Sequence, residues 1–240
     1  MHYRTIQEAR TLSGTRLILT AGVPGPWGEA AKAVFKARSV PYAPIAQELG
    51  GANEEQVQWL GIRNAPVAVH NDEKPRSGWA EILFLAERLG SGPSLIPADP
   101  LERALMFGIS HELAGENGLG WTRRLMIVTG PIEEGPASPA YGFAKFFGDS
   151  YGYTPAAGRA AERRCIDILT MLSDQLARQH AAGRRYLVGT TLSAADIYWA
   201  TFANLLDPLP EEQCPMSPEI RAMYGSSPPT VRNAASRELL

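Results

Sequence analysis

The segment from Leu17 to Arg38 constrains the fold of this chain more than any other. It begins with a short apolar run, Leu17–Leu19, that has the length and composition of a buried strand. A turn rich in glycine and proline follows over residues 22–26, and apolar residues then recur with helical spacing. Strand, tight turn and helix in this order open a βαβ unit. The start of such a helix carries free N–H groups and the positive end of the dipole, so it is a good place for a thiolate or another anion.

The next 50 residues continue to mix strand and helix patterns. Pro66 starts a strand-like run, which places that run at a sheet edge, at a strand's first residue or after a cis bond. Asn53 with Gln56 three residues later predicts a capping box. The expected elements are an extended run at 40–45, a helix beginning at Asn53, a strand at 65–70 and an amphipathic helix at 79–89. We expect residues 1–15 to form a loose extension.

The pattern changes at the linker-like Gly90–Pro93 segment, after which strand signals almost vanish. Strong helix starts follow at Asp99, Thr154 and Ser193. We expect helices from residue 100 to about 128 with a break or kink near its glycines, at 140–147, from 155 to about 182 and from 194 to about 206, with a loop at 130–139. A mixed half followed by a helical half predicts two domains, residues 1–91 and 92–240.

Charge and cysteine content narrow the class of protein. The net charge is −2 and the pI about 6.1, so the chain lacks the basic footprint of a nucleic-acid or membrane-surface binder. No apolar run approaches the roughly 20 residues of a membrane span, and the first residues are polar, so we expect a cytoplasmic protein. Cys165 falls on a helical apolar stripe and is expected to be a buried free thiol, Cys214 is expected to form no disulfide, and the four histidines form no metal motif.

Four stretches in this order resemble the cytosolic glutathione transferases over about residues 16–206. They are the strand–turn–helix with Gly25–Gly28, the Pro66–Val69 strand, Arg76-Ser77 before an apolar helix and DPLERA, and YLVG before LSAADI at 186–197. The resemblance implies an α/β N-terminal thioredoxin-like domain plus an all-α C-terminal helical domain, the glutathione transferase fold. It also implies that Ser193 and Asp196 are a buried folding cap.

The resemblance implies glutathione as co-substrate and indicates where it would bind. The thiol would lie at the turn formed by Gly25 and Trp27, and its backbone would pair with Ala65 before a cis Pro66. The γ-glutamyl end would meet Arg76 and Ser77, where the family usually has an acidic residue before Ser or Thr. Gly25 and Gly28 stand where a glutaredoxin-like member has cysteines, so disulfide exchange by a protein thiol is not expected here.

Without a side-chain partner, the thiolate would depend on backbone N–H groups near Gly25–Gly28 and on the helix N-terminus. A hydrogen bond to a charged group contributes about 1.5–3 kcal/mol, or roughly one to two pKa units. Thr20 offers a hydroxyl at the strand end, although ordinary turn chemistry is the better explanation for it.

A second substrate would lie between the domains. Trp121, Tyr141 and His111, with Trp27, Phe143 and Phe146, are candidates for its wall, although each could instead pack the helical core. The main hypothesis is conjugation of the glutathione thiol to a small apolar electrophile, a chemistry typical of detoxification. One alternative is a non-catalytic binding protein with a degenerate thiol site. Another is a protein that uses a different thiol cofactor, or that binds a carboxylate ligand recognised through Arg76. The resemblance further implies a homodimer.

Overall fold

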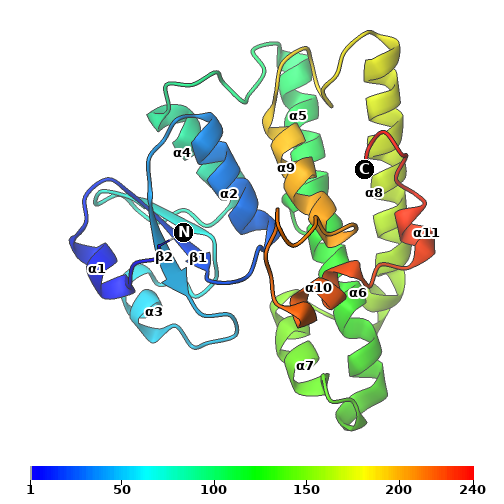
Figure 1. Cartoon of the computed structure of the whole chain (residues 1–240), viewed down its shortest axis with the longest axis horizontal. Coiled ribbons are helices and arrows are strands. Elements are labelled where there is room, and N and C mark those ends of the chain that lie inside the picture. Colours follow the sequence, from blue (N-terminus) through cyan, green and yellow to red (C-terminus); the bar gives the residue numbers. More distant parts are fainter. Residues whose placement is uncertain (1) are drawn as a thin grey trace.

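The computed structural model describes residues 2–240 as two halves that lie side by side (Figure 1). The first half holds a three-stranded sheet in the order β2-β1-β3. β1 (Thr15–Thr20) pairs in parallel with β2 (Ala43–Gln47) and antiparallel with β3 (Val67–His70). β1, the helix after it and β2 form the predicted βαβ unit. The boundary between residues 91 and 92 stays a prediction.

Alternating side chains of β1 build two layers on the sheet. Leu17 and Leu19 pack under α2 (Pro26–Ala37) and α4 (Trp79–Leu89), on the side that faces the helical half. Ile18, opposite Ile45 in the register, packs under α1 (Ile6–Thr11) and α3 (Glu54–Leu60) on the other side. The sheet is therefore covered on both faces, and its α2 face carries the core shared with the second half.

The expectation of a loose extension at residues 1–15 is wrong for the described residues 2–15. Thr5 and Glu8 form a capping box that starts α1, and Ile6 buries its side chain in the second layer. Arg4 pairs with Ile45 at the edge of β2, where its N–H donates to the carbonyl of Pro44 at 2.9 Å. The segment adds apolar contacts and a backbone pair to the sheet, which explains its order.

The predicted capping box at Asn53 is also wrong. Asn53 has a left-handed backbone (φ 49°), and its side chain bonds the backbone of Glu48 and Gly51 instead of the helix start. Gln56 is buried, and its amide donates to the carbonyls of Ile62 and Asn64, both at 2.9 Å. Gln56 thus holds the loop that leads into Pro66.

The second half is helical, as predicted. Asp99, Thr154 and the Ser193–Asp196 box cap their helices as predicted. The first long helix breaks at residues 115–118, and the next continues past Pro131 where a loop was expected. The helices are α5 (Pro100–Ala114), α6 (Leu119–Glu134), α7 (Tyr141–Ser150), α8 (Pro155–Ala181), α9 (Ala194–Phe202), α10 (Pro218–Gly225) and α11 (Pro229–Arg232), with 3₁₀ turns at Gly135–Ala137 and Ala203–Leu205.

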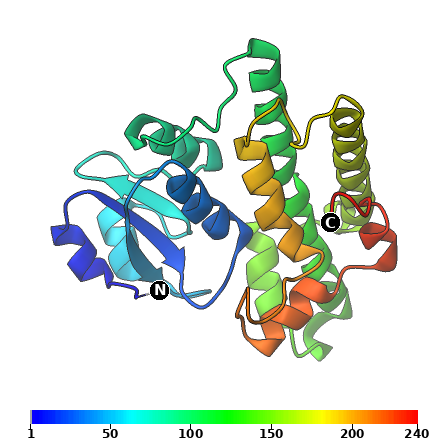
Figure 2. The same cartoon turned by 45° about the horizontal axis from the view of Figure 1, so that its top comes forward.

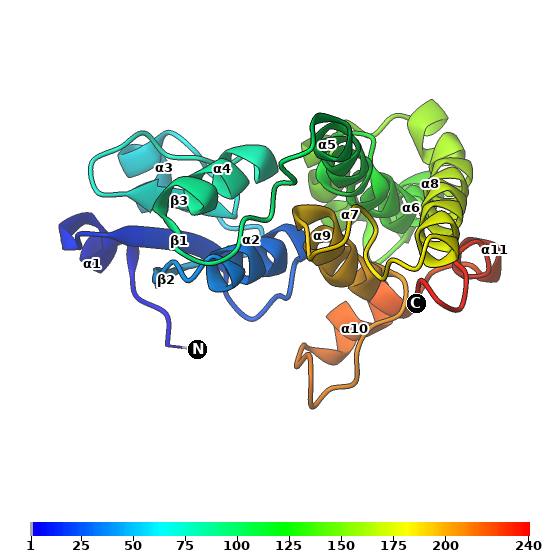
Figure 3. The same cartoon turned by 90° about the horizontal axis from the view of Figure 1, so that it is seen from above.

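The two halves share one hydrophobic core. α2 lies against α9 (Figure 2, blue and orange), and Phe35 and Phe202 are buried in the same cluster. The Tyr198 hydroxyl donates to the carbonyl of Trp79 at 3.1 Å, so α9 is also tied to the start of α4. Figure 3 shows the halves from above, joined along this seam. Within residues 2–240, no helix combines the length and apolar character needed to cross a membrane.

Candidate functional site

A cavity of about 480 Å³ lies between the two halves. From the first half it is lined by the β1–α2 turn, the Ala65–Pro66 bond and the start of α4. From the second half it is lined by the α5–α6 turn and by parts of α6, α7 and α10. Most of the residues that the sequence singled out therefore meet in one place. Gly25, Trp27, Thr20, Ala65, Pro66, Ser77, His111 and Trp121 all line it.

The start of α2 supplies backbone donors to this cleft. Gly25 is the N-cap residue, and its own N–H donates to the carbonyl of Val23 at 2.8 Å. Pro26 has no N–H, and that of Glu29 closes the first helical bond to Gly25 at 2.9 Å. The N–H groups of Trp27 and Gly28 therefore stay without helical acceptors and define the positive end of α2. An anion bound at this turn would meet these two donors.

The position of Gly25 has room for a side chain. A Cβ atom added to Gly25 meets nothing within 4 Å, whereas one added to Gly28 would lie 3.3 Å from Leu19. The Thr20 hydroxyl, the other candidate, donates to Oε1 of Gln47 at 3.0 Å. Its proton is thus engaged within the protein, in agreement with a structural role at the strand end.

The bond between Ala65 and Pro66 is cis, as the resemblance implied. The pairing of β3 with β1 ends at Val67 opposite Ile18, so Ala65 continues the edge strand into the cleft without a sheet partner. Its backbone can pair there with a peptide-like ligand. Ser77 lies near the start of α4, where helix N–H groups and a hydroxyl face the same cavity.

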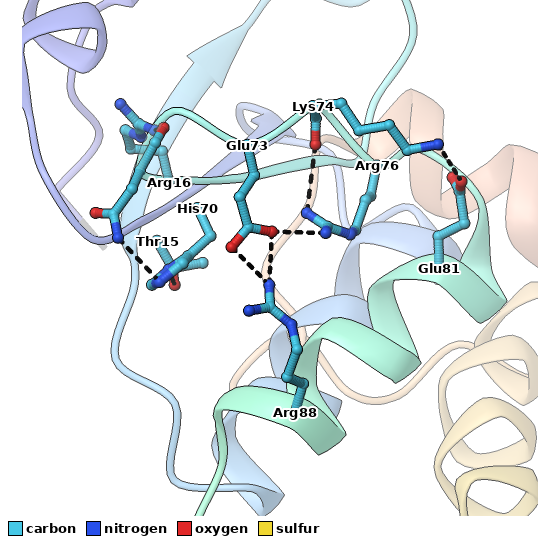
Figure 4. A network of polar contacts seen from close by, with 9 residues as sticks. Thr15, Arg16, His70, Glu73, Lys74, Arg76, Glu81 and Arg88 are labelled. Atoms are coloured by element: carbon cyan, nitrogen blue, oxygen red, sulfur yellow. Dashed lines mark hydrogen bonds and ion pairs between the residues drawn. The ribbon is translucent and has the colours of Figure 1, made fainter.

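Arg76 does not line the cavity, so its placement does not support the expectation that it pairs with a ligand carboxylate. Its Nη2 donates to Oε2 of Glu73 at 2.6 Å, and Arg88 of α4 binds the same carboxylate at 2.6 and 2.7 Å (Figure 4). Hydrogen bonds from Arg88 and then Arg76 lower the pKa of Glu73 to about 2. Arg76 therefore already has an acidic partner within the loop before α4, which it shares with Arg88.

Trp27 connects the turn to the helical half. Its indole Nε1 donates to the carbonyl of Ala114 at 2.8 Å, and its ring meets that of Phe202 edge-on at 5.0 Å between centroids. A Cβ atom on Gly120 would lie 2.4 Å from Phe202 and 2.8 Å from Trp27. Glycine is therefore required at position 120 for this close approach.

The aromatic wall differs in part from the predicted one. Trp121, Phe143 and Phe146 line the cavity, whereas Tyr141 at the start of α7 does not. Phe147 and Tyr151 were missed, although they extend a stripe from Phe143 at four-residue spacing that helical periodicity could have revealed. His111 is exposed at the rim of the cavity.

Two further residues of the wall have no signal in the sequence. Arg124 of α6 and Tyr224 of α10 are buried side by side, and Arg124 donates from Nη2 to the Tyr224 hydroxyl at 3.3 Å. The Tyr224 hydroxyl also donates to the carbonyl of Pro24 at 3.5 Å, across 200 residues of chain. Residues 207–240, which had no assigned role, thus close the cavity behind the thiol-site turn.

The charged and phenolic groups of the wall perturb one another. Burial lowers the pKa of Arg124, but the neighbouring Tyr224 and Tyr151 raise it, and the net direction is upward. Burial raises the pKa of Tyr151 despite the opposing effect of Arg124. At neutral pH Arg124 is therefore charged, and Tyr151 is a neutral hydrogen-bond donor.

Neither cysteine belongs to the cleft. Cys165 is a free thiol, buried against Thr122, and its pKa is raised by burial. Cys214 is also free and has a raised pKa from partial burial. Across residues 2–240 there is no group of three or more His, Cys, Asp or Glu side chains placed to hold a metal ion.

Solved structures with the same architecture extend over nearly the whole chain. A Tau-class glutathione S-transferase from mango, Mangifera indica, is 20% identical over 94% of both chains, with a TM-score of 0.56. The beta-etherase LigF from Sphingobium sp. strain SYK-6 is 18% identical over 92% of this chain and 98% of its own, with a TM-score of 0.58. A glutathione S-transferase from Methylobacillus flagellatus, solved with glutathione bound, is 14% identical over 92% and 98%, with a TM-score of 0.59.

The chain therefore has the glutathione S-transferase fold, a thioredoxin-like half joined to a helical half, as the resemblance implied. No family model and no curated protein matches the sequence. At these identities the likeness defines the fold, and the chemistry must be argued from the cleft itself.

Proposed function

We propose that the chain binds glutathione in this cleft and conjugates it, through its thiol sulfur, to a small electrophile held by the aromatic wall. The observation that carries the proposal is the convergence of three parts in one cavity. These are the free edge at Ala65 before the cis Pro66, the N-terminal donors of α2 at Trp27 and Gly28, and Ser77 near the start of α4. They match the peptide backbone, the thiolate and the γ-glutamyl carboxylate of glutathione, respectively.

The reaction would proceed without a protein nucleophile. Donors at the N-terminus of α2 stabilise the thiolate, and the rings of Trp121 and Phe147 hold an apolar partner next to it. The thiol proton passes to solvent, and sulfur attack on the electrophile forms the carbon–sulfur bond. An aryl halide then loses halide with the electron pair of the broken carbon–halogen bond, whereas the electron pair of the double bond of an unsaturated carbonyl compound takes up a proton from solvent. Rate enhancement then comes mainly from proximity and from preorganised donors.

Calorimetric titration with reduced glutathione tests the proposal. We expect one site per chain with a dissociation constant between micromolar and low millimolar, followed by turnover of aryl halides or unsaturated carbonyl compounds. Oxidised glutathione and S-methyl glutathione serve as matched ligands that lack the thiol. Absence of both heat and thermal shift at millimolar reduced glutathione would reject the proposal.

A second candidate function is ligand binding without catalysis. Two observations favour it: Gly25 offers no hydroxyl or thiol, and the Thr20 hydroxyl is bound to Gln47. In that case glutathione binds, but the pKa of its thiol stays near the free value of about 8.5. The pH dependence of thiolate absorbance in the complex separates the two functions, and turnover of any electrophile rejects this second one.

We also propose a homodimer that pairs through α4 and α5. Phe84 and Leu101 on these helices are 47% and 81% exposed, and Arg103 lies over the stacked rings of Phe84 and Phe107. Large apolar side chains gathered on one face are typical of protein interfaces. Light scattering on the purified protein tests this, and a monomer at micromolar concentration would contradict it.

A further inference from the structure

The guanidinium of Arg124 is buried in the wall of the cleft without an acidic partner. The residue is 5% exposed, yet none of the ion pairs within residues 2–240 includes it. Nη2 donates to the hydroxyl of Tyr224, and Nε is buried with no hydrogen-bond partner. A buried charge is costly unless something compensates it, so this group is prepared for an anion that the chain does not supply.

Its neighbour Arg123 shows what a purely structural arginine looks like in the same helix. Arg123 is 1% exposed, and its guanidinium donates to the carbonyls of Leu205 and Tyr224 and to the hydroxyls of Ser226 and Ser227. It does not line the cavity, whereas Arg124 does. The two residues are adjacent in sequence, but only Arg124 lines the cavity and keeps an Nε–H without a protein partner.

The surroundings of Arg124 favour a flat molecule. Its guanidinium carbon lies 5.5 Å from the ring centroid of Phe147 and 5.2 Å from that of Tyr224. Tyr151, which adds a phenolic donor, packs at 5.0 Å from both Trp121 and Phe147 between centroids. Planar walls of this kind accept aromatic rings by stacking or edge contacts.

The other charged side chains that line the cavity are either paired with an opposite charge or exposed to solvent. Lys32 is paired with Glu29 at 2.6 Å, and Arg63 and Glu116 are exposed at the rim. Arg124 is also linked through the Tyr224 hydroxyl to the carbonyl of Pro24, immediately before the thiol-site turn. An anion held by Arg124 would therefore lie beside the place where the thiolate is proposed to sit.

We propose that Arg124 is the anion-recognising residue of the second-substrate site, and that the electrophile is a small aromatic molecule carrying a carboxylate. This inference rests on the proposed function. The planar fork of a guanidinium matches a carboxylate with two parallel hydrogen bonds, and the aromatic wall holds the ring. Arg124 binds and orients the substrate and takes no part in bond making.

A matched pair of aryl chlorides makes the inference testable: 4-chloro-3-nitrobenzoate and its methyl ester. In both, the thiolate sulfur attacks the ring carbon that bears chlorine, the carbon–sulfur bond forms, and chloride leaves with the electron pair of the broken bond. Each rate is divided by the uncatalysed rate with glutathione, because the ester is intrinsically more reactive. What remains is the contribution of the carboxylate to recognition.

We expect Arg124→Met to lower kcat/KM for the acid about 10- to 100-fold, as loss of a charged hydrogen bond implies, while the ester changes little. Arg124→Lys should retain part of the activity on the acid, because the charge remains but the fork is lost. Arg63→Met removes an exposed cation from the rim and should leave the acid-to-ester ratio unchanged. Equal losses for acid and ester in Arg124→Met would overturn the inference and point to an effect on the thiolate or on packing.

Binding of 3-nitrobenzoate without glutathione provides a second, independent readout. Wild-type protein should bind it and discriminate against 3-nitrobenzamide, a result that does not depend on whether the Arg124 variants fold. Glutathione binding without this discrimination would reject the inference and leave the proposed function standing. Binding of the benzoate without glutathione binding would retain the anion site and reject the proposed function.

Discussion

The indole nitrogen of Trp27 and the carbonyl oxygen of Ala114 are 2.8 Å apart, in a hydrogen bond that joins the two halves at the cleft. Trp27 belongs to the first turn of α2, and Ala114 is the last residue of α5. Carbonyl groups in the last turn of a helix have no helical partner, so this one receives its donor from the other half. The bond ties the thiol-site turn to the helical wall.

Gly120→Ala is expected to disturb this junction. The new Cβ would lie 2.4 Å from Phe202 and 2.8 Å from Trp27, so the free energy of unfolding should fall by about 1–3 kcal/mol. Denaturant unfolding followed by tryptophan fluorescence measures the stability. Gly108→Ala is the matched control, since it lies within α5 with nothing near its Cβ and should be neutral or stabilising. A Gly120→Ala variant as stable as wild type would contradict the expectation.

Gly25→Ser is expected to strengthen thiolate binding. The position is open, so a hydroxyl fits there and can donate to sulfur. One such bond should lower the pKa of bound glutathione by about one to two units. The pH dependence of thiolate absorbance in the complex measures this shift. Gly25→Ala fills the same space without a donor and should behave as wild type. An unchanged pKa in the serine variant would show that sulfur does not lie at this turn.

The Glu73 network should make part of the stability depend on pH. Because Arg88 and Arg76 lower the folded pKa of Glu73 from 4.5 to about 2, its contribution is present above pH 4.5. It is lost as the pH falls through 4.5 towards 2, where the carboxyl takes up a proton in both states. Unfolding midpoints of wild type and Glu73→Gln between pH 7 and pH 2 test this. The difference between them should shrink on acidification, and a constant difference would rule out the titration of Glu73 as its source.

Asp196→Ala is expected to cost stability without changing ligand affinity. Oδ1 accepts from the Leu187 N–H and Oδ2 from the Ser193 N–H and hydroxyl, each at 2.8 Å. Loss of this cap should lower the free energy of unfolding by about 2–3 kcal/mol. Asp167→Ala on the exposed side of α8 is the control, where a surface pair with Arg163 contributes at most about 0.5 kcal/mol. Equal effects of the two variants in urea unfolding would refute the capping role.

Leu101→Glu should dissociate the proposed dimer. The side chain is 81% exposed, so the substitution leaves the folded chain intact but puts a charge on the proposed interface. Light scattering should show a shift from dimer to monomer with unchanged circular dichroism. Leu209→Glu, at a side chain that is 47% exposed outside α4 and α5, is the control and should remain dimeric. A Leu101→Glu variant that stays dimeric would place the interface elsewhere.

Local signals explain which elements were predictable from the sequence. Both ends of α4 follow directly from its apolar stripe. The starts of α5, α8 and α9 follow from the side chains that cap these helices. α1 was missed because six mostly polar residues give little periodicity, and its order depends on contacts with β2. Asn53 was misread because a left-handed backbone turns its side chain away from the helix that follows.

In the candidate site, too, the parts with a local sequence signal were predictable and the parts that depend on tertiary contacts were not. The thiol-site turn and the Ala65–Pro66 bond were recognisable, because glycine and proline mark backbone geometry in the sequence itself. The placement of Arg76 outside the cavity is not readable from the sequence, since nothing local reveals that its guanidinium binds Glu73, which Arg88 also binds. The sequence holds no pattern that pairs Arg124 with Tyr224, because the two residues are 100 positions apart and come into contact only in the folded chain. Contacts made only by tertiary folding lie outside what spacing and composition can show.

The bond from Tyr224 to Pro24 has a consequence for how the protein is made. The two residues are separated by 200 positions, which a ribosome needs roughly 10–40 s to add. The sheet and the turn at residues 22–26 can form early, but their rear wall emerges only with α10. A nascent chain thus carries a thioredoxin-like half with an unfinished site, and the cleft closes only after α10 has emerged.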